Sequence, residues 1–346
     1  MEAPPDNHVL WARALHFQHR DGSPALQGVS VGVREGEILA VSGPRGSGKT
    51  TLLRCLSGMV RPQEGEVWFN GAPVHGMGPL KRERLRRDRF GWIDPAPVLV
   101  PELSAWENAA LPLMLRGTGR RRAKTAAMEW LDRLDVGGAT ARRRPHELQH
   151  AERQRVGLAR ALAVDPEVLL FDEPFSALDP LIRRDMQEEV VRLHREEGRT
   201  MVFITHDLQE ALKLGDRIAL MRDGRVVQLG TPEEIVGSPA DDYVREFVRD
   251  VPREQVLTVR TAMRPATSSD EAGTGPALRP DATVSEAIEA VARAGSAARV
   301  MDDGRCLGVV DADALLGVVA GTAAPEERRE GAAVLPEEAE LPKEAV

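Results

Sequence analysis

The chain contains 346 residues, enough for one large domain of about 200–250 residues and one smaller domain. Apolar residues make up 42% of the sequence, which is ample for a core, and 46 basic against 54 acidic side chains give a net charge of −8, so no global basic field favours nucleic acid as a partner. Only Cys55 and Cys306 occur, which argues against a disulfide framework and is typical of a reducing compartment.

The N-terminal part predicts short strands followed by a glycine-rich loop and a helix. Turn residues separate the strands expected within residues 8–42, and the last of these strands is the apolar run Ile38–Val41. Beyond the loop and its helix, Glu66–Phe69 predicts a further strand. The pair Asn70-Gly71 after it predicts a tight turn.

The glycine-rich loop is the segment Gly43-Pro44-Arg45-Gly46-Ser47-Gly48-Lys49-Thr50, and Thr51 opens the helix-like stretch that follows. This is the pattern of a phosphate-binding loop between a strand and a helix. Glycines let backbone N–H groups approach phosphates, the lysine reaches the β and γ oxygens, and the last hydroxyl binds Mg²⁺. The sequence therefore predicts that residues 43–51 bind ATP and that Thr50 is a Mg²⁺ ligand.

The middle of the chain predicts an α/β fold with inserted helices. Residues 97–163 are rich in arginine and follow a helical pattern, which indicates a helical subdomain. Two continuous apolar runs, Glu167–Asp172 and Thr200–Thr205, predict parallel strands that are buried on both faces of a sheet. Helices and a hairpin are expected between and after these strands, at residues 181–198, 207–214 and 217–229.

Groups suited to ATP hydrolysis follow both apolar runs. Asp172 ends the first run and can hold Mg²⁺ through water, and Glu173 can act as general base toward the attacking water. The segment Ser176–Asp179 comes directly afterwards. His206 follows the second run, where its imidazole is expected near the γ-phosphate. These residues predict an ATPase with Glu173 and His206 as its catalytic pair.

With these motifs in this order, residues 8–250 resemble the ATP-binding subunits of ABC transporters. The resemblance implies a P-loop NTPase fold of the ABC nucleotide-binding type, with an antiparallel β subdomain and the inserted helical subdomain. By this resemblance, Gly43–Thr51 is Walker A and Val168–Glu173 is Walker B. Ser176–Asp179 is the D-loop and His206 is the switch histidine. It further implies that Asp179 contacts nucleotide and that His19 stacks on adenine, where the family carries an aromatic residue. A plain turn residue is the alternative for His19.

Two segments depart from that family's pattern. Pro95 stands at the position of the Q-loop glutamine, and proline has no side-chain amide that could bind Mg²⁺ or orient water. Leu148–Glu152 stands at the position of a Leu-Ser-Gly-Gly-Gln signature, which in the family holds the γ-phosphate of nucleotide bound to the opposite subunit. His150 and Ala151 add side chains where close backbone approach is needed, and Glu152 adds a negative charge. We therefore expect weakened hydrolysis and intact nucleotide binding.

The same signature segment allows a second interpretation. His146-Glu147-Leu148-Gln149-His150 matches the H-E-x-x-H pattern of zinc proteases, in which two histidines four residues apart on a helix hold Zn²⁺. Pro145 would start this segment, and no separate protease domain is apparent. The zinc interpretation is therefore the weaker one.

The chain changes character past Asp250. We assign residues 1–250 to the ATP-binding domain, 251–322 to a small α+β module with its linker, and 323–346 to an acidic tail expected to be disordered. Thr267–Pro280 is rich in Ser, Thr, Gly and Pro and predicts a flexible loop or linker. The module is expected to run helix, strand, turn, strand and helix, at residues 284–294, 298–301, 302–304, 306–310 and 312–319.

The C-terminal sequence resembles one group within the family. Residues 242–251 and 256–260 look like the glycine betaine/proline (quaternary amine) uptake ATPases, which carry C-terminal CBS repeats, and residues 256–320 resemble one such repeat. Glu107–Leu113 is also similar to lipoprotein-release and macrolide-export ATPases, which is the alternative transporter type. A regulatory ATP-binding subunit without turnover is the alternative from another functional class.

The resemblance also implies partners and a location. These are membrane permease subunits, a second ATP-binding domain in a homodimer or heterodimer, and an extracytoplasmic solute-binding protein, at the cytoplasmic face of the membrane, with no nucleic acid. The longest uncharged run, residues 67–80, is too short to cross a bilayer. The N-terminus lacks the basic-then-apolar pattern of a targeting segment.

Overall fold

The computed structural model describes residues 7–267 and 275–321. The chain divides into two compact units, Met1–Val251 and Pro252–Val346. The tail expected to be disordered and the central part of the expected linker lie outside the described residues. No helix in the described part of the chain combines the length and apolar content needed to cross a bilayer.

The first unit begins with an antiparallel sheet in the order β2-β1-β4-β5. Its strands are β1 (His8–Gln18), β2 (Pro24–Arg34), β4 (Glu64–Phe69) and β5 (Ala72–Pro73). Asn70 and Gly71 join β4 to β5 with φ of 46° and 72°. Two successive positive φ values are typical of the tight hairpin turn that the Asn-Gly pair predicted.

The second sheet of this unit has six strands in the order β10-β9-β3-β8-β7-β6. They are β3 (Ile38–Ser42), β6 (Phe90–Ile93), β7 (Val168–Asp172), β8 (Thr200–Thr205), β9 (Arg217–Arg222) and β10 (Arg225–Gly230). β10 pairs antiparallel with β9, and the other neighbours pair parallel. Every residue of β3, β7 and β8 is buried, which confirms the expected parallel sheet covered on both faces.

Alternate side chains of this sheet enter two separate cores. Phe171 and Phe203 pack in a core with apolar side chains of helices that lie between residues 105 and 197. Leu170 and Val202, their neighbours along the strands, pack in a second core with the helix that follows the glycine-rich loop and with the antiparallel sheet. Because successive residues of a strand point to opposite faces, one continuous apolar run can build both cores.

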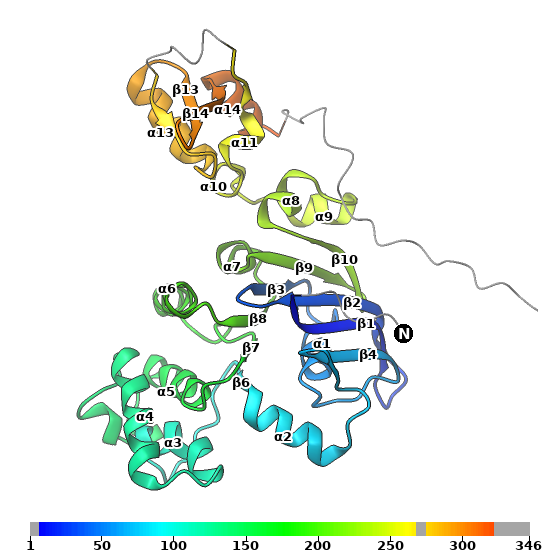
Figure 1. The fold of residues 1–346 in the computed structure, drawn as a ribbon, viewed down its shortest axis with the longest axis vertical. Coiled ribbons are helices and arrows are strands. Elements are labelled where there is room, and N and C mark those ends of the chain that lie inside the picture. Colours follow the sequence, from blue (N-terminus) through cyan, green and yellow to red (C-terminus); the bar gives the residue numbers. More distant parts are fainter. Residues whose placement is uncertain (1–6, 268–274, 322–346) are drawn as a thin grey trace, which may run out of the picture. The chain divides into compact units, whose positions relative to one another are not determined.

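Helices cover the sheet and form an insertion between β6 and β7 (Figure 1). The insertion contains α3 (Ala105–Leu115), α4 (Arg120–Arg133), the 3-10 turns η1 (Thr140–Arg142) and η2 (Pro145–Glu147), and α5 (His150–Leu162). The remaining helices of this unit are α1 (Lys49–Leu56), α2 (Pro79–Arg89), α6 (Pro180–Glu197), α7 (Leu208–Leu214), α8 (Pro232–Gly237) and α9 (Asp242–Phe247).

The second unit is a small α+β module built on a sheet in the order β11-β14-β13-β12. Its elements are α10 (Arg253–Val256), α11 (Val259–Ala262), β11 (Arg264–Pro265), β12 (Ala277–Leu278), α13 (Val284–Ala294), β13 (Ala298–Asp302), β14 (Arg305–Val310) and α14 (Ala312–Val319). The expectation of a linker throughout residues 267–280 was wrong at β12, which pairs parallel with β13. A strand of two residues leaves no periodic pattern in a sequence.

Candidate nucleotide site

The glycine-rich loop connects β3 to α1 and turns sharply where it meets other backbone. Gly43 has φ of 145°, and a Cβ there would lie 2.1 Å from the Met221 carbonyl oxygen. Gly48 has φ of 100°, and a Cβ there would lie 2.2 Å from the Ala25 carbonyl oxygen. Glycine is required at both positions, because a side chain would be strained and would overlap rigid backbone. Gly46 also has positive φ, of 80°, but a Cβ there meets nothing within 4 Å.

Lys49 is the first residue of α1 and is only 4% exposed. Its Nζ donates hydrogen bonds to the carbonyl oxygens of Gly43 and Pro44, each at 2.8 Å. Burial lowers the pKa of the Lys49 ammonium, and the carboxylates of Glu173 and Asp172 oppose that shift. The loop therefore holds a buried cation beside two acidic groups.

The next residue joins the loop to the end of β7. The Thr50 hydroxyl donates to Asp172 Oδ1 at 2.8 Å. Burial raises the pKa of the Asp172 carboxyl, and the hydrogen bond from Thr50 opposes the rise. Mg²⁺ prefers oxygen ligands and usually combines one or two protein groups with water and substrate phosphates. These two oxygens fit that ion, because they belong to the right chemical types and already lie within hydrogen-bond distance of each other.

Glu173 and His206 meet at the ends of the neighbouring strands β7 and β8. His206 Nδ1 lies 3.0 Å from Glu173 Oε2. Glu173 has φ of 48°, a left-handed conformation that costs a residue with a side chain about 1–2 kcal/mol. The backbone N–H of Glu173 donates to the Ile204 carbonyl oxygen at 3.0 Å, which anchors the strained residue to β8. The two residues predicted as catalytic are thus brought together as a hydrogen-bonded pair.

Asp179 caps the helix that follows this pair. Its Oδ1 accepts hydrogen bonds from the backbone N–H groups of Leu181 and Ile182, at 3.1 and 3.2 Å. Capping by aspartate stabilises a helix N-terminus by about 1 kcal/mol. The Ser176 hydroxyl donates to the Glu173 carbonyl oxygen at 3.0 Å. The segment predicted as the D-loop is therefore tied to the acidic residue at one end and to α6 at the other.

The other predicted nucleotide contacts lie at the surface or along the loop. Arg45 and Pro44 are exposed, and Thr51 is partly buried in the first turn of α1. Ser47 is buried, and its hydroxyl has no hydrogen-bond partner among the described residues. His19 is exposed in the turn after β1, and its ring meets Phe17 edge-on at 5.5 Å between ring centroids.

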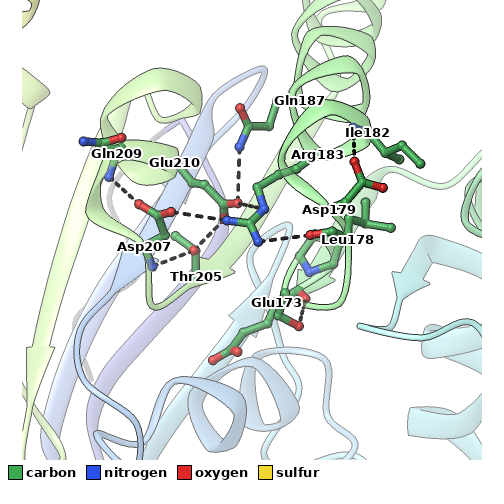
Figure 2. Close-up of polar contacts among 12 residues, drawn as sticks. Glu173, Leu178, Asp179, Ile182, Arg183, Gln187, Thr205, Asp207, Gln209 and Glu210 are labelled. Atoms are coloured by element: carbon green, nitrogen blue, oxygen red, sulfur yellow. Dashed lines mark hydrogen bonds and ion pairs between the residues drawn. The ribbon is translucent and has the colours of Figure 1, made fainter. Parts of the chain in front are cut away.

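The sequence motifs did not indicate two residues that lie near the site, Arg183 on α6 and Glu210 on α7. Both line a pocket with Glu173 and His206. Glu210 is 6% exposed, and Arg183 forms ion pairs with it and with Asp207 (Figure 2). Each lies four residues after a motif residue that was recognised, Asp179 or His206. That spacing on a helix would have been the available signal.

The zinc interpretation of residues 146–150 fails on the backbone. His146 lies in η2, whereas His150 is the first residue of α5. The extended conformation of Leu148, with φ of −92° and ψ of 141°, separates the two. The two imidazoles therefore do not share one helix face. Within the described ranges, no group of three or more His, Cys, Asp or Glu residues could hold a metal ion.

In or beside the two segments that depart from the resemblance, carboxylates accept local hydrogen bonds. Asp94, next to Pro95, accepts a hydrogen bond from Trp92 Nε1 at 2.8 Å. Gln149 is the N-cap residue of α5, and its backbone N–H donates to Glu152 Oε2 at 2.8 Å. A carboxylate of this chain therefore already occupies the anion-attracting N-terminus of α5.

Known ATP-binding proteins of transport systems are similar to this chain in sequence. A family model described as ABC transporter matches residues 26–176. The trimethylamine N-oxide transport system ATP-binding protein TmoW of Ruegeria pomeroyi is 36% identical over 295 residues, which cover 85% of this chain and 85% of TmoW. The glycine betaine/proline betaine transport system ATP-binding protein ProV of Salmonella typhimurium is 41% identical over 242 residues, which cover 70% of this chain and 60% of ProV.

A solved structure extends the match to three dimensions. The dimeric ATP-binding cassette MJ0796, in a post-hydrolysis state bound to ADP and Pi, superposes with a TM-score of 0.59 at 31% identity. It covers 64% of this chain and 98% of its own chain. The ABC-type α/β fold with an antiparallel β subdomain, which the family resemblance implied, is confirmed.

The present chain spans 60% of the length of ProV, whereas it matches TmoW over most of both proteins. This chain is more than 30% identical to TmoW along 85% of that protein, and a family model and a solved structure also match it. The chain therefore belongs to the family of ABC transporter ATP-binding proteins.

Proposed function

We propose that this chain binds and hydrolyses ATP to drive a membrane permease. The observation that carries the proposal is the convergence, at one edge of the sheet, of a buried lysine, a hydroxyl–carboxylate pair and a glutamate–histidine pair. Lys49 and the loop backbone would bind the phosphates. Thr50 and Asp172 would hold Mg²⁺, which when bound neutralises charge on the β- and γ-phosphate oxygens.

Glu173 acts in this proposal as the general base. Its carboxylate would accept a proton from the attacking water, and His206 would hold that carboxylate in place through the 3.0 Å contact between Nδ1 and Oε2. The left-handed backbone of Glu173 fixes the direction of its side chain, which is a common arrangement at functional sites. Asp179 would contact the nucleotide of a second subunit while it caps α6, and His19 would stack on adenine.

We further propose quaternary amines as the transported solutes. ProV is named for glycine betaine and proline betaine, and TmoW is named for trimethylamine N-oxide. All three solutes carry a positively charged, four-coordinate nitrogen that has at least two methyl groups and no N–H bond. The match to TmoW extends over 295 residues, more than the 251 of the first unit, so part of the second unit is shared with that protein. This assignment implies that the chain works at the cytoplasmic face of the membrane, with permease subunits and a solute-binding protein as partners.

Uptake by cells tests the transport proposal. Cells that lack this chain would be supplied with either the native chain or Glu173→Gln, and uptake of labelled glycine betaine would be measured at high external salt. The native chain should restore uptake and Glu173→Gln should not. Equal restoration by both chains would refute coupling to hydrolysis, and restoration by neither, with normal expression, would refute the solute assignment.

A subunit that binds ATP without turnover is the second candidate, and one contact favours it. The Glu152 carboxylate accepts from the Gln149 N–H at the N-terminus of α5, where the resemblance calls for open backbone amides. Pro95 removes the Q-loop amide as well. A homodimer would carry both changes in both of its sites, whereas a heterodimer could complete one site with an intact partner. Restoring Gln at position 95 and Ser-Gly-Gly at 149–151 should raise turnover if these changes limit it.

The second unit is proposed to be a single CBS-like regulatory motif. Its sheet, with α13 packed against β13 and α14 packed against α13, supports a compact module, and two subunits could pair their single copies. Measuring ATP turnover of the full chain over a range of ionic strength, with and without added AMP, tests this role. Turnover that stays unchanged in every condition would argue against regulation by the module.

A further inference from the structure

The Arg183 side chain extends from α6 to three oxygens, one in the loop after β7, one in the loop after β8 and one on α7 (Figure 2). Its Nη2 donates a hydrogen bond to the Leu178 carbonyl oxygen at 3.2 Å, within the predicted D-loop. Its Nη1 lies 3.8 Å from Asp207 Oδ2, and its Nε lies 3.8 Å from Glu210 Oε1, beyond the second loop. One guanidinium thus spans the loop after β7 and the loop after β8.

Glu210 fixes the backbone on either side of His206. The Thr205 hydroxyl donates to Glu210 Oε2 at 2.7 Å and accepts from the backbone N–H of Asp207 at 2.9 Å. Gln187 Nε2 donates to Glu210 Oε1 at 3.2 Å. Burial raises the pKa of the Glu210 carboxyl, whereas Arg183 and these hydrogen bonds favour its charged form. A buried carboxylate of this kind needs its cationic partner, because an unpaired buried charge is costly.

The other loop leads back to Glu173. The backbone N–H and the hydroxyl of Ser176 both contact the Glu173 carbonyl oxygen, at 3.2 and 3.0 Å. Leu178, which Arg183 holds, lies two residues farther along the same loop. The contact between Glu173 and His206 then closes a ring of interactions that runs through Arg183, Glu210 and Thr205. The Arg183 guanidinium therefore contacts both loops of this ring.

The contacts of Arg183 with Asp207 and Glu210 are longer than hydrogen bonds. Both ion-pair distances are 3.8 Å, longer than the 2.7–3.2 Å typical of a hydrogen bond. The buried Nε of Arg183 has no hydrogen-bond partner among the described residues, although Glu210 Oε1 lies near it. A small movement of the Leu178 loop toward α7 would let this N–H bond to the carboxylate.

We propose that Arg183 is a positioning residue that couples the loop at Ser176–Asp179 to the orientation of His206 and Glu173. The proposal rests on the proposed ATPase function, because its consequence is the alignment of the general base. Movement of the first loop, which faces the second subunit in that proposal, would tighten the Arg183–Glu210 pair and thereby lock the Thr205–Asp207 segment. Arg183 acts through these residues and is not itself catalytic.

Two substitutions at Arg183 and one beside it test the coupling in the full chain. Arg183→Met removes the guanidinium but keeps the apolar stem, and Arg183→Lys keeps the charge without the fork of donors. Arg184→Met is the matched control, because Arg184 is the next residue of α6, its side chain is 64% exposed, and its ion pair within the described residues is the one with Glu188, at 3.9 Å. For each chain we would measure ATP affinity, kcat, KM and the melting temperature, together with amide hydrogen exchange.

Arg183→Met should lower kcat by about 10- to 100-fold, because small misplacement of a catalytic group has effects of that size. Its ATP affinity and KM should stay within about twofold of the native values. Hydrogen exchange should become faster in both segments, residues 174–179 and 204–209. Arg183→Lys should recover part of kcat, and Arg184→Met should match the native chain.

Exchange that becomes faster in neither segment, or only within α6, would overturn the coupling. A fall in kcat no larger than that of Arg184→Met would also overturn it. A native chain that binds ATP without turnover would refute the hydrolysis proposal alone, and the exchange comparison would still decide the role of Arg183. If Arg183→Met fails to fold, the same exchange comparison with Arg183→Lys decides, since weaker donors should loosen both segments.

Discussion

Gly46 and Gly48 lie two residues apart in the phosphate-binding loop and allow strain to be separated from overlap. Both have positive φ, so alanine at either position costs about 1–2 kcal/mol of backbone strain. At Gly48 the new Cβ would also lie 2.2 Å from the Ala25 carbonyl oxygen, a rigid backbone atom of β2. At Gly46 it would meet nothing within 4 Å. Overpacking adds about 1–3 kcal/mol, so Gly48→Ala should lose about 2–5 kcal/mol and Gly46→Ala about 1–2 kcal/mol.

Urea unfolding followed by tryptophan fluorescence measures these losses in the first unit. All five tryptophans of the chain lie in it, at positions 11, 68, 92, 106 and 130. ATP affinity measured on the same samples supplies a second comparison. Gly46→Ala should weaken binding while it keeps most of the stability, because Gly46 faces open space in the loop. Equal losses of unfolding free energy for the two variants would refute the argument from overlap.

Three further predictions follow from contacts of the same site. Lys49→Met removes the buried ammonium and should weaken ATP binding about 10- to 100-fold by calorimetry; unchanged affinity would exclude Lys49 from phosphate binding. Burial raises the pKa of the Asp172 carboxyl above its unfolded value of 3.8, so the protonated carboxyl stabilises the folded state at low pH. This stabilisation is lost as pH rises from the unfolded pKa through the folded pKa. Asp172→Asn should therefore become more stable relative to the native chain as pH rises from about 4 to 7 in urea titrations, and a constant difference would contradict this. Glu173→Gly relieves the φ of 48° and should stabilise the first unit by about 1 kcal/mol while it abolishes turnover; a loss of stability would show that the backbone is not strained.

The sheet and the phosphate-binding loop could be predicted because single, continuous signals encode them. The apolar runs at β3, β7 and β8 are long enough to specify strands buried on both faces, and each ends beside a polar motif. The loop requires glycine at Gly43 and Gly48, where the chain approaches other backbone, so its pattern is nearly independent of the rest of the fold.

Other parts of the site depend on contacts between distant segments. Arg183 and Glu210 are 27 positions apart and become partners only because α6 and α7 follow neighbouring strands. The left-handed backbone of Glu173 likewise has no signature, since glutamate is an ordinary residue on a strand. The hydrogen bond from the Gln149 N–H to Glu152 is likewise not evident from the sequence, which shows the charge of Glu152 but not the N–H that it binds.

The decisive experiment for hydrolysis is to measure ATP turnover by the purified full chain with Mg²⁺ beside Glu173→Gln, with nucleotide binding measured separately. We expect measurable turnover by the native chain, slow because of Pro95 and residues 148–152. Glu173→Gln should lose turnover, and both chains should retain ATP binding. Turnover that persists in Glu173→Gln would contradict the assignment of the general base. If the native chain binds ATP but shows no turnover, the claim that this chain hydrolyses ATP without a different partner subunit would be wrong.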